Sequence, residues 1–343
     1  MTEASATTAT AVYVCPACRA AIDRDVDPPI CRGCERPYAT TVGIPDFRLE
    51  YLDPYSSREE DARAARELAA QSQDLDLERL LREHWRQAGK PPKFVERFVK
   101  GDMVAPERAE ADVAAVEQAL GRALTPNDRV LEVGAGTAAL GLAAARRGSH
   151  VLASDVSMRW LVLARKRIEE AGAEIELVCC AAEALPFRDE AFDLVIAGDV
   201  VEHVADQRRF VGECTRVLAP GGLFFLATPN RYSVGLEPHV RLWGVGFLPR
   251  PVARKYVEVV RRAPYDHVRL LSSIALRRLL ESEGLRVTID PPEVSPASQR
   301  LYGGVELRLV RIYNRLRQVD AVRLGLRAIG PFFHVFAVKE PGR

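Results

Sequence analysis

The sequence has almost no net charge and no long apolar run. Its 343 residues carry 48 Lys and Arg against 47 Asp and Glu, a net charge of +1. No run reaches the 18 or so apolar residues that a membrane-spanning helix needs. The first eleven residues are small and polar and lack the basic start of a signal peptide. These features argue against a membrane-spanning or globally basic protein, and we expect a cytoplasmic location with a disordered tail over residues 1–11.

Cysteine is too sparse for a secreted disulfide scaffold, with seven residues in the whole chain. Four of them form two C-x2-C pairs separated by 12 residues, a spacing that lets four thiolates close a tetrahedral shell on zinc. A segment this short has too little core to fold without the metal. We therefore predict a structural zinc ion in residues 12–50, held by Cys15, Cys18, Cys31 and Cys34. The other cysteines (Cys179, Cys180 and Cys214) are expected to pack in the core.

The stretch Val130–Leu140 has the pattern of a buried strand, a glycine turn and the start of a helix. The turn at Gly134 and Gly136 lets a ligand approach bare backbone near a helix N-terminus. A second short strand over 150–154 ends at Asp155, 21 residues after Gly134. An acidic residue at that place can accept hydrogen bonds from the two hydroxyls of a ribose. The pattern therefore predicts a nucleotide-type ligand.

Three further motifs follow in order: ALPF at 184–187, FDLVI at 192–196 and RVLAPGG at 216–222. With the E-x-G-x-G turn, residues 128–230 resemble the core of class I S-adenosylmethionine (SAM) methyltransferases. The resemblance implies an α/β fold with a Rossmann-like seven-stranded sheet, and SAM as cofactor. It implies these cofactor-binding residues: Glu132, Gly134, Ala135, Gly136, Asp155, Val156, Ala182, Glu183 and Asp199. A dinucleotide dehydrogenase would have a third glycine where Ala139 stands.

Two positions depart from the methyltransferase pattern. Ala138 stands where the turn usually has a further glycine, and Ala181 stands where an acidic residue often receives the adenine amino group. Adenine recognition then has to rest on backbone, on Glu183, or on packing against Cys180 and Ala182. A degenerate, non-catalytic domain that recruits a partner through its zinc module remains an alternative.

The remaining segments are assigned by pattern. Residues 38–47 end in GIPDF and resemble the close of a Trm112-like zinc ribbon. Residues 51–125 are expected to form a helical linker that covers the cofactor cleft, with one helix beginning at Pro106. Residues 126–343 are the predicted methyltransferase domain, in which Ser157 caps a helix and 231–265 form a substrate lid. Residues 300–330 are predicted to form amphipathic helices.

Three histidines are candidates for a general base that takes the proton of an acceptor hydroxyl. His203 follows Glu202 at the end of the fourth strand, His239 lies in the predicted lid, and His267 lies on the side of the sixth strand. Methyl transfer depends mainly on alignment, and a base within hydrogen-bonding reach helps a hydroxyl acceptor. His267 is the first choice by a narrow margin. A structural role is the alternative for each of them.

The charge is unevenly distributed, since residues 241–343 hold 19 Lys and Arg against 9 Asp and Glu. A basic, amphipathic 300–330 segment could touch an anionic membrane, but we favour a role in capping the core. The expected activity is O-methylation of a small molecule, a natural product, or a glycan that is free or lipid-linked. RNA methylation is the second reading, disfavoured by the low net charge. The oligomeric state stays open.

Overall fold

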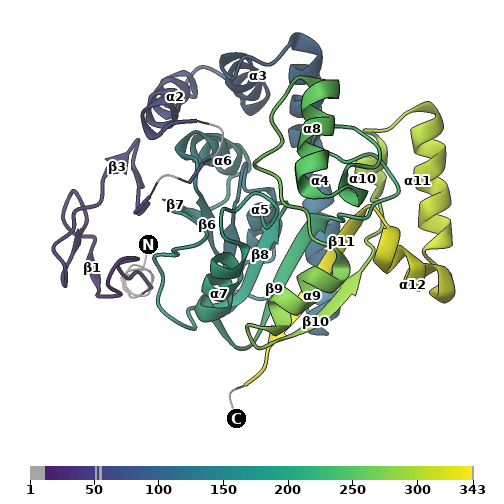
Figure 1. Ribbon diagram of the computed structural model, residues 1–343. Helices are drawn as coiled ribbons and strands as arrows, with labels where there is room; N and C mark the ends of the chain where they lie inside the picture. Colours follow the sequence, from purple (N-terminus) through teal and green to yellow (C-terminus); the bar gives the residue numbers. More distant parts are fainter. Residues whose placement is uncertain (1–11, 51, 54–55, 342–343) are drawn as a thin grey trace.

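A seven-stranded sheet forms the centre of the molecule, and helices cover both of its faces (Figure 1). The computed structural model describes residues 12–50, 52–53 and 56–341. The tail expected over residues 1–11 lies outside the described residues. The predicted Rossmann-like α/β fold is confirmed.

The strand order of the sheet is β10-β11-β9-β8-β5-β6-β7. These strands are β5 (Arg129–Val133), β6 (His150–Asp155), β7 (Glu176–Cys179), β8 (Phe192–Gly198), β9 (Leu218–Pro229), β10 (Leu285–Asp290) and β11 (Phe332–Lys339). Strands β5 to β9 pair in parallel, whereas β11 runs antiparallel to both β9 and β10. The order reverses between β5 and β8, and open α/β sheets bind their ligands at the carboxyl ends of strands beside such a switch.

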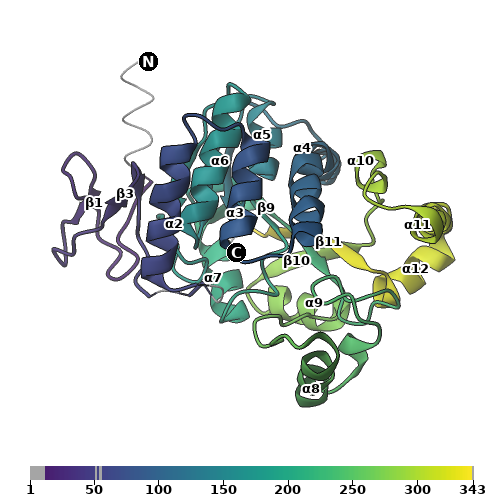
Figure 2. The ribbon, with the colours of Figure 1, turned by 90° about the horizontal axis from the view of Figure 1, so that it is seen from above.

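Helices cover both faces of the sheet, so that β5, β6 and β8 are buried along almost their whole length. One face carries α4 (Pro92–Leu120), α5 (Ala139–Ala145) and α6 (Met158–Glu170), with α2 (Arg58–Gln71) and α3 (Leu77–Gln87) packed against α6. The other face carries α7 (Gln207–Val217) and α9 (Ser273–Glu281), as Figure 2 shows.

Helix α4 corrects the expectation that a helix begins at Pro106. The helix begins instead at Pro92, where a proline without an N–H costs nothing, and it continues through Pro106 to Leu120. Buried residues lie on both sides of the proline, with Val95 and Val99 before it and Val113 after it. Packing of both halves therefore outweighs the hydrogen bond that an interior proline removes.

The predicted lid, residues 231–265, forms a short 3-10 turn η1 (Val245–Phe247) and helix α8 (Arg250–Arg261). Four buried apolar side chains give this segment a small core of its own: Leu242, Val245, Ala253 and Val257. The lid therefore packs as a compact unit after the carboxyl end of β9.

The chain between β10 and β11 forms α10 (Pro296–Gln299), α11 (Gly304–Leu316) and α12 (Asp320–Ile329). We expected the 300–330 segment to cap the core. The two helices cover it only in part, because no side chain of α11 or α12 is fully buried, whereas Leu307, Val310 and Leu326 are half-buried. None of the helices in the described part of the chain combines the length and the apolar character needed to cross a bilayer.

The ribbon, residues 12–50, consists of two small hairpins, β1 (Ile22–Asp23) with β2 (Ile30–Cys31) and β3 (Thr40–Thr41) with β4 (Ile44–Pro45). It is hydrogen-bonded to the rest of the protein at both ends. Val14 N donates to Pro186 O at 3.0 Å, and Phe47 N donates to Cys179 O at 2.8 Å. Its aromatic side chains, including Tyr13 and Phe47, belong to the same buried cluster as the central strands. The ribbon is therefore part of the main core.

A buried ion-pair network joins the ribbon, α2 and the end of β6. The Arg48 side chain is 1% exposed and pairs with Asp46 at 2.5 Å and with Asp61 at 2.8 Å. Its Nη1 also donates to the carbonyl of Val156 at 2.8 Å. Three segments that are far apart in sequence therefore meet on one guanidinium group, directly beside the end of β6.

Asp61 also caps α6, which corrects the role expected for Ser157. The Ser157 hydroxyl donates to Asp61 Oδ1 at 3.0 Å instead of accepting from its own helix. The Asp61 carboxylate accepts from the backbone N–H groups of Met158 and Arg159. A carboxylate suits this position because it satisfies free N–H groups and opposes the positive end of the helix dipole.

Replacement of Asp61 by alanine should destabilise the protein by about 3–5 kcal/mol, because it leaves the Arg48 charge short of a partner in a buried place and removes the cap of α6. Urea unfolding measures this. Glu67→Ala, an exposed acidic residue on the same helix, is the matched control and should change stability by less than about 0.5 kcal/mol. Equal effects of the two substitutions would show that the network contributes nothing.

Candidate functional site

The glycine turn lies at the carboxyl end of β5. Gly134 has a φ of +68°, and a Cβ there would come within 2.4 Å of a methyl carbon of Val200. Gly136 has a φ of +52°, but a Cβ built there meets no protein atom within 4 Å. The first glycine thus permits close packing against the segment after β8, and the second leaves one side of the turn open.

Ala138, where a further glycine was expected from the pattern, adopts a left-handed conformation with a φ of 55°. The backbone shape that usually calls for glycine is therefore retained with alanine, at a cost of about 1 kcal/mol. Ala135 N donates to Ser154 O at 2.9 Å and joins the turn to β6.

Asp155 lies at the end of β6 and faces the turn. Its Oδ2 accepts from Gly136 N at 2.9 Å, and its Oδ1 accepts from Ser157 N at 2.8 Å. Burial raises the pKa of Asp155 to about 6. Each carboxylate oxygen keeps a further lone pair. The residues around the open side of Gly136 thus fit a ligand that offers two adjacent hydroxyl groups, as the ribose of SAM does.

Glu132 and Val156 are turned toward the protein. Glu132 is buried, its Oε2 accepts from Gly141 N at 2.9 Å, and burial raises its pKa to about 8. Its carboxyl group thereby ties β5 to α5. The carbonyl of Val156 accepts from Arg48, so the backbone beside Asp155 is held by the ribbon and α2.

The segment after β7 contains the residues expected near adenine. Glu183 Oε1 accepts from Ala205 N at 2.8 Å and from Asp206 N at 3.3 Å, at the start of α7. Ala181 is buried and Ala182 is partly buried. The structure therefore engages Glu183 with the loop before α7. In the neighbouring backbone, Cys180 N donates to Asp155 O at 3.0 Å and Ala181 O accepts from Ala184 N at 3.1 Å.

Residues 199–203 continue from the carboxyl end of β8. Asp199 N donates to Ala227 O at 2.8 Å, and desolvation raises the pKa of the Asp199 side chain. Glu202 is fully buried, and its Oε2 accepts from the hydroxyl of Thr228 at 3.0 Å. Burial raises the pKa of Glu202 to about 8. Because Val200 packs on Gly134, this segment adjoins the glycine turn.

The lid brings His239 to His203. His239 Nε2 lies 3.2 Å from His203 Nε2, and His239 Nδ1 lies 2.5 Å from Glu237 Oε1. Burial alone would lower the pKa of His239, but its hydrogen bond to Glu237 outweighs this and the pKa is raised. Burial, followed by the effect of His239, lowers the pKa of His203 to about 4. The pair therefore combines a basic imidazole with one that stays neutral.

His267 acts electrostatically on this pair, because its charge contributes to the lowered pKa of His203. The segment that carries it is tied to the same loop, because Arg269 N donates to Glu202 O at 2.8 Å. Of the three candidate histidines, the structure thus places His203 and His239 in direct contact and His267 close by.

The four ribbon cysteines converge as the spacing predicted, with sulfur atoms within 4.8 Å of one another. Cys15 Sγ lies 3.7 Å from Cys34 Sγ, and Cys18 Sγ lies 3.4 Å from Cys31 Sγ. Cys31 Sγ also accepts from two backbone N–H groups of its own turn. Four sulfurs on a sphere of about 2.3 Å around zinc are separated by similar distances, so the group fits a zinc ion.

A second group of donor atoms within 4.8 Å of one another consists of Glu202, His203 and His239. One buried carboxylate and two imidazoles are a donor set that transition metals accept. The same distance between the two imidazoles also suits a direct hydrogen bond.

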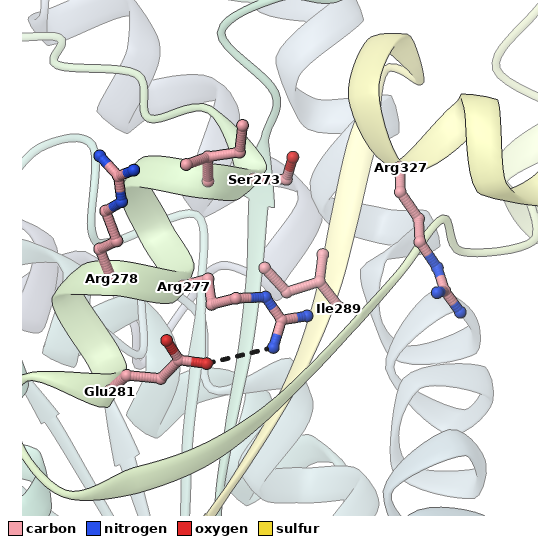
Figure 3. Close-up of a pocket in the computed structure, with 7 residues that line it drawn as sticks. Ser273, Arg277, Arg278, Glu281, Ile289 and Arg327 are labelled. Atoms are coloured by element: carbon pink, nitrogen blue, oxygen red, sulfur yellow. Dashed lines mark hydrogen bonds and ion pairs between the residues drawn. The ribbon is translucent and has the colours of Figure 1, made fainter.

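A surface depression of about 240 Å³ lies elsewhere, between α9, β10 and α12. Figure 3 shows its side chains, among them Arg277, which pairs with Glu281, and Arg327 on α12. Among the described residues, none of those predicted to bind cofactor or to act in catalysis lines it. It therefore belongs to a different surface.

Two parts of this arrangement were missed at the sequence level. Glu237 was not singled out, although its position two residues before His239 offered a weak signal. Arg48 and Asp61 gave no signal, because they are separated by 13 residues and meet the site through Val156 and Ser157, about a hundred residues further along the chain.

Comparison with known proteins supports the motif assignment. A family model described as a methyltransferase domain matches residues 131–226. The ubiquinone biosynthesis O-methyltransferase of Sinorhizobium fredii is 32% identical over 160 residues, which are 47% of this chain and 60% of the relative. That of a Chelativorans species is 37% identical over 150 residues, 43% of this chain and 58% of the relative. The chain thus spans about 60% of the length of these relatives.

Among solved structures, the YcgJ protein of Bacillus subtilis aligns with a TM-score of 0.45 and 20% identity. The alignment covers 67% of this chain and 99% of that protein. The family model, over residues 131–226, includes both the glycine turn and the RVLAPGG motif.

Proposed function

The chain carries a class I SAM-dependent methyltransferase domain, and from this premise we propose that it methylates a hydroxyl group of a small molecule. The observation that carries the proposal is the meeting of two features at the carboxyl edge of the sheet. Asp155 and the open side of Gly136 offer a place for a ribose. His203 follows on the segment whose Val200 packs on Gly134, and His239 of the lid contacts His203 there.

Cofactor binding would rest on the chain's own backbone and two carboxylates. Asp155 would accept from the two ribose hydroxyls, and the turn at 134–136 with Asp199 would hold the amino-acid end. The segment 180–182, with Ala182, would hold the adenine. When bound, SAM supplies an electrophilic methyl group for in-line transfer to oxygen.

His239 is the proposed general base. With Nδ1–H held by Glu237, the acceptor hydroxyl would replace His203 as the donor to Nε2 of His239 and give its proton to that nitrogen as the hydroxyl oxygen takes the methyl group. Glu237 holds Nδ1–H of the same ring and stabilises the imidazolium cation that results. His203 stays neutral beside Nε2 and is a positioning residue for the acceptor oxygen.

The lid and the relatives narrow the class of acceptor molecule that we propose. The two relatives are named for O-methylation in ubiquinone biosynthesis, which supports a small-molecule acceptor. A glycan acceptor, lipid-linked or free, stays a prediction. RNA is less favoured because the aromatic side chains of the described ribbon, Tyr13, Tyr38 and Phe47, are buried in the core and unable to stack on bases.

We also propose that the ribbon binds one structural zinc ion through Cys15, Cys18, Cys31 and Cys34. Because the ribbon shares the core with Phe187 and Phe192, the metal would stabilise the methyltransferase domain as well as the ribbon itself. A zinc module that only recruits a partner is the second candidate, and failure to bind SAM would favour it.

Asp155→Asn should weaken SAM binding by roughly tenfold or more, since the amide offers one acceptor in place of two. Calorimetric titration measures the affinity. Because the pKa of Asp155 is raised to about 6 and the carboxylate form binds the hydroxyls, affinity should fall as pH drops below about 6. Asp189→Asn, an exposed residue on another loop, should bind as the parent does. Unchanged affinity in Asp155→Asn would overturn the cofactor geometry.

His239→Asn should lower kcat by about 100-fold or more, whereas His267→Asn should lower it less than tenfold. The groups around His239 are Glu237, Glu202, Asp199 and His203. Activity is lost as pH falls through the raised pKa of His239, so Glu237→Gln should move this loss to lower pH and reduce the maximal rate. A pH profile that Glu237→Gln leaves in place would contradict the proposed base.

Metal analysis of the purified protein should find one zinc per chain. Cys31→Ser should lose the zinc and lower the melting temperature, while Cys214→Ala, at a buried thiol outside the ribbon, should keep it. A second metal equivalent that disappears in His239→Asn would instead assign the Glu202, His203 and His239 group to an ion, and the hydrogen-bonded base would be wrong.

A further inference from the structure

Helix α11 exposes an apolar stripe at the edge of the molecule. The helix stands at the end opposite the ribbon in both views (Figures 1 and 2). One side of it carries four apolar side chains spaced three and four residues apart, which therefore form one row. Their exposed fractions are high: Val305 70%, Leu309 59%, Ile312 51% and Leu316 46%. Val319, which precedes α12 in the connection after α11, is also 51% exposed.

The helix is attached to the protein by a different side. Tyr313 OH donates to Pro292 O at 2.7 Å, Asn314 Nδ2 donates to Val294 O at 2.9 Å, and Arg317 pairs with Glu293 at 3.3 Å. The half-buried Leu307 and Val310 lie on this attached side as well. The helix therefore has a second apolar row, and that row points away from the core.

A row of arginines flanks the apolar row. Arg308, Arg311 and Arg315 are spaced three and four residues apart and are all exposed. Helical geometry places this row about a quarter turn from the apolar row. Helix α12 adds Leu324, 66% exposed, next to Arg323 and Arg327. Residues 300–330 hold seven arginines and two acidic residues. Four of these arginines pair with acidic residues elsewhere, namely Arg300 with Glu107, Arg317 with Glu293, and Arg323 and Arg327 with Asp290. The exposed charge of the segment therefore lies mainly in Arg308, Arg311 and Arg315.

We propose that α11, with α12 beside it, binds the protein to the surface of an anionic membrane. Charge decides the occupant, because a second copy of this chain would bring the same arginines against each other. Apolar side chains at the headgroup boundary with arginines beside them are the pattern of an interfacial helix. The net charge of the whole chain is close to zero, so the basic carboxyl third would orient the molecule with this end toward negative lipid.

The membrane surface would place the lid near lipid. Arg241 of the lid pairs with Glu306 at the start of α11 at 2.8 Å, and Val234 N donates to Ile329 O at the end of α12. The lid therefore touches both ends of the basic helical pair. Binding to lipid does not depend on the proposed methyl transfer and is measured without cofactor or acceptor.

The test is flotation of the full-length protein with vesicles of phosphatidylcholine alone, or of phosphatidylcholine and phosphatidylglycerol in equal parts. We expect binding only to the second, and weaker binding at high salt because the Debye length shortens. Leu309→Glu should reduce binding at least tenfold. Val26→Glu, at a 45% exposed site in the ribbon, is its matched control and should bind normally.

The charge is tested separately. Arg311→Gln with Arg315→Gln should lower the vesicle partition by about tenfold or more, and Arg63→Gln with Arg66→Gln on α2 should not. Both pairs are exposed, and circular dichroism checks that each variant is folded. Three outcomes would overturn the proposal: no binding to either vesicle, a dimer in solution that Leu309→Glu dissociates, or binding to RNA that the arginine pair abolishes and Leu309→Glu retains.

Discussion

The buried Arg48 guanidinium is the constraint on which the amino-terminal half of this protein depends. A charge removed from water has to be paired, and Arg48 is paired with Asp46 from the ribbon and Asp61 from α2. Its remaining bond to the Val156 carbonyl fixes the backbone next to Asp155. The position of Asp155 is therefore set in part by residues that lie about a hundred positions earlier in the chain.

The same contacts explain why the ribbon belongs to the catalytic domain. It extends the β7 edge through Phe47 and lies against the ALPF segment through Val14. Its cysteines sit at the outer end of a core shared with the sheet, so a metal held there would stabilise both. The lid provides the other half of the site in a similar way. It brings Glu237 and His239 to the loop that follows β8 and carries His203.

Patterns with a local cause were the ones that could be predicted. The glycine turn, Asp155 and the four cysteines follow short spacing rules, and the ordered motifs carry the resemblance that implied the seven-stranded sheet, so these were recognised. The helix start predicted at Pro106 is wrong because tertiary packing on both sides of the proline outweighs a local preference. The side-chain cap predicted for Ser157 is wrong because a carboxylate from another helix accepts from the first N–H groups of α6. The orientation of the 300–330 segment could not be predicted, because amphipathicity does not say which side of a helix faces the protein.

The sheet domain, the nucleotide-type turn and the cysteine group could be predicted from the sequence alone, since each depends on residues close together in the chain. Only the tertiary structure decided that His239 meets His203, that Arg48 holds the end of β6, and that α11 turns an apolar row outward. These three depend on contacts between segments dozens to more than a hundred residues apart. Their partners are chosen by packing and burial, which no local pattern records.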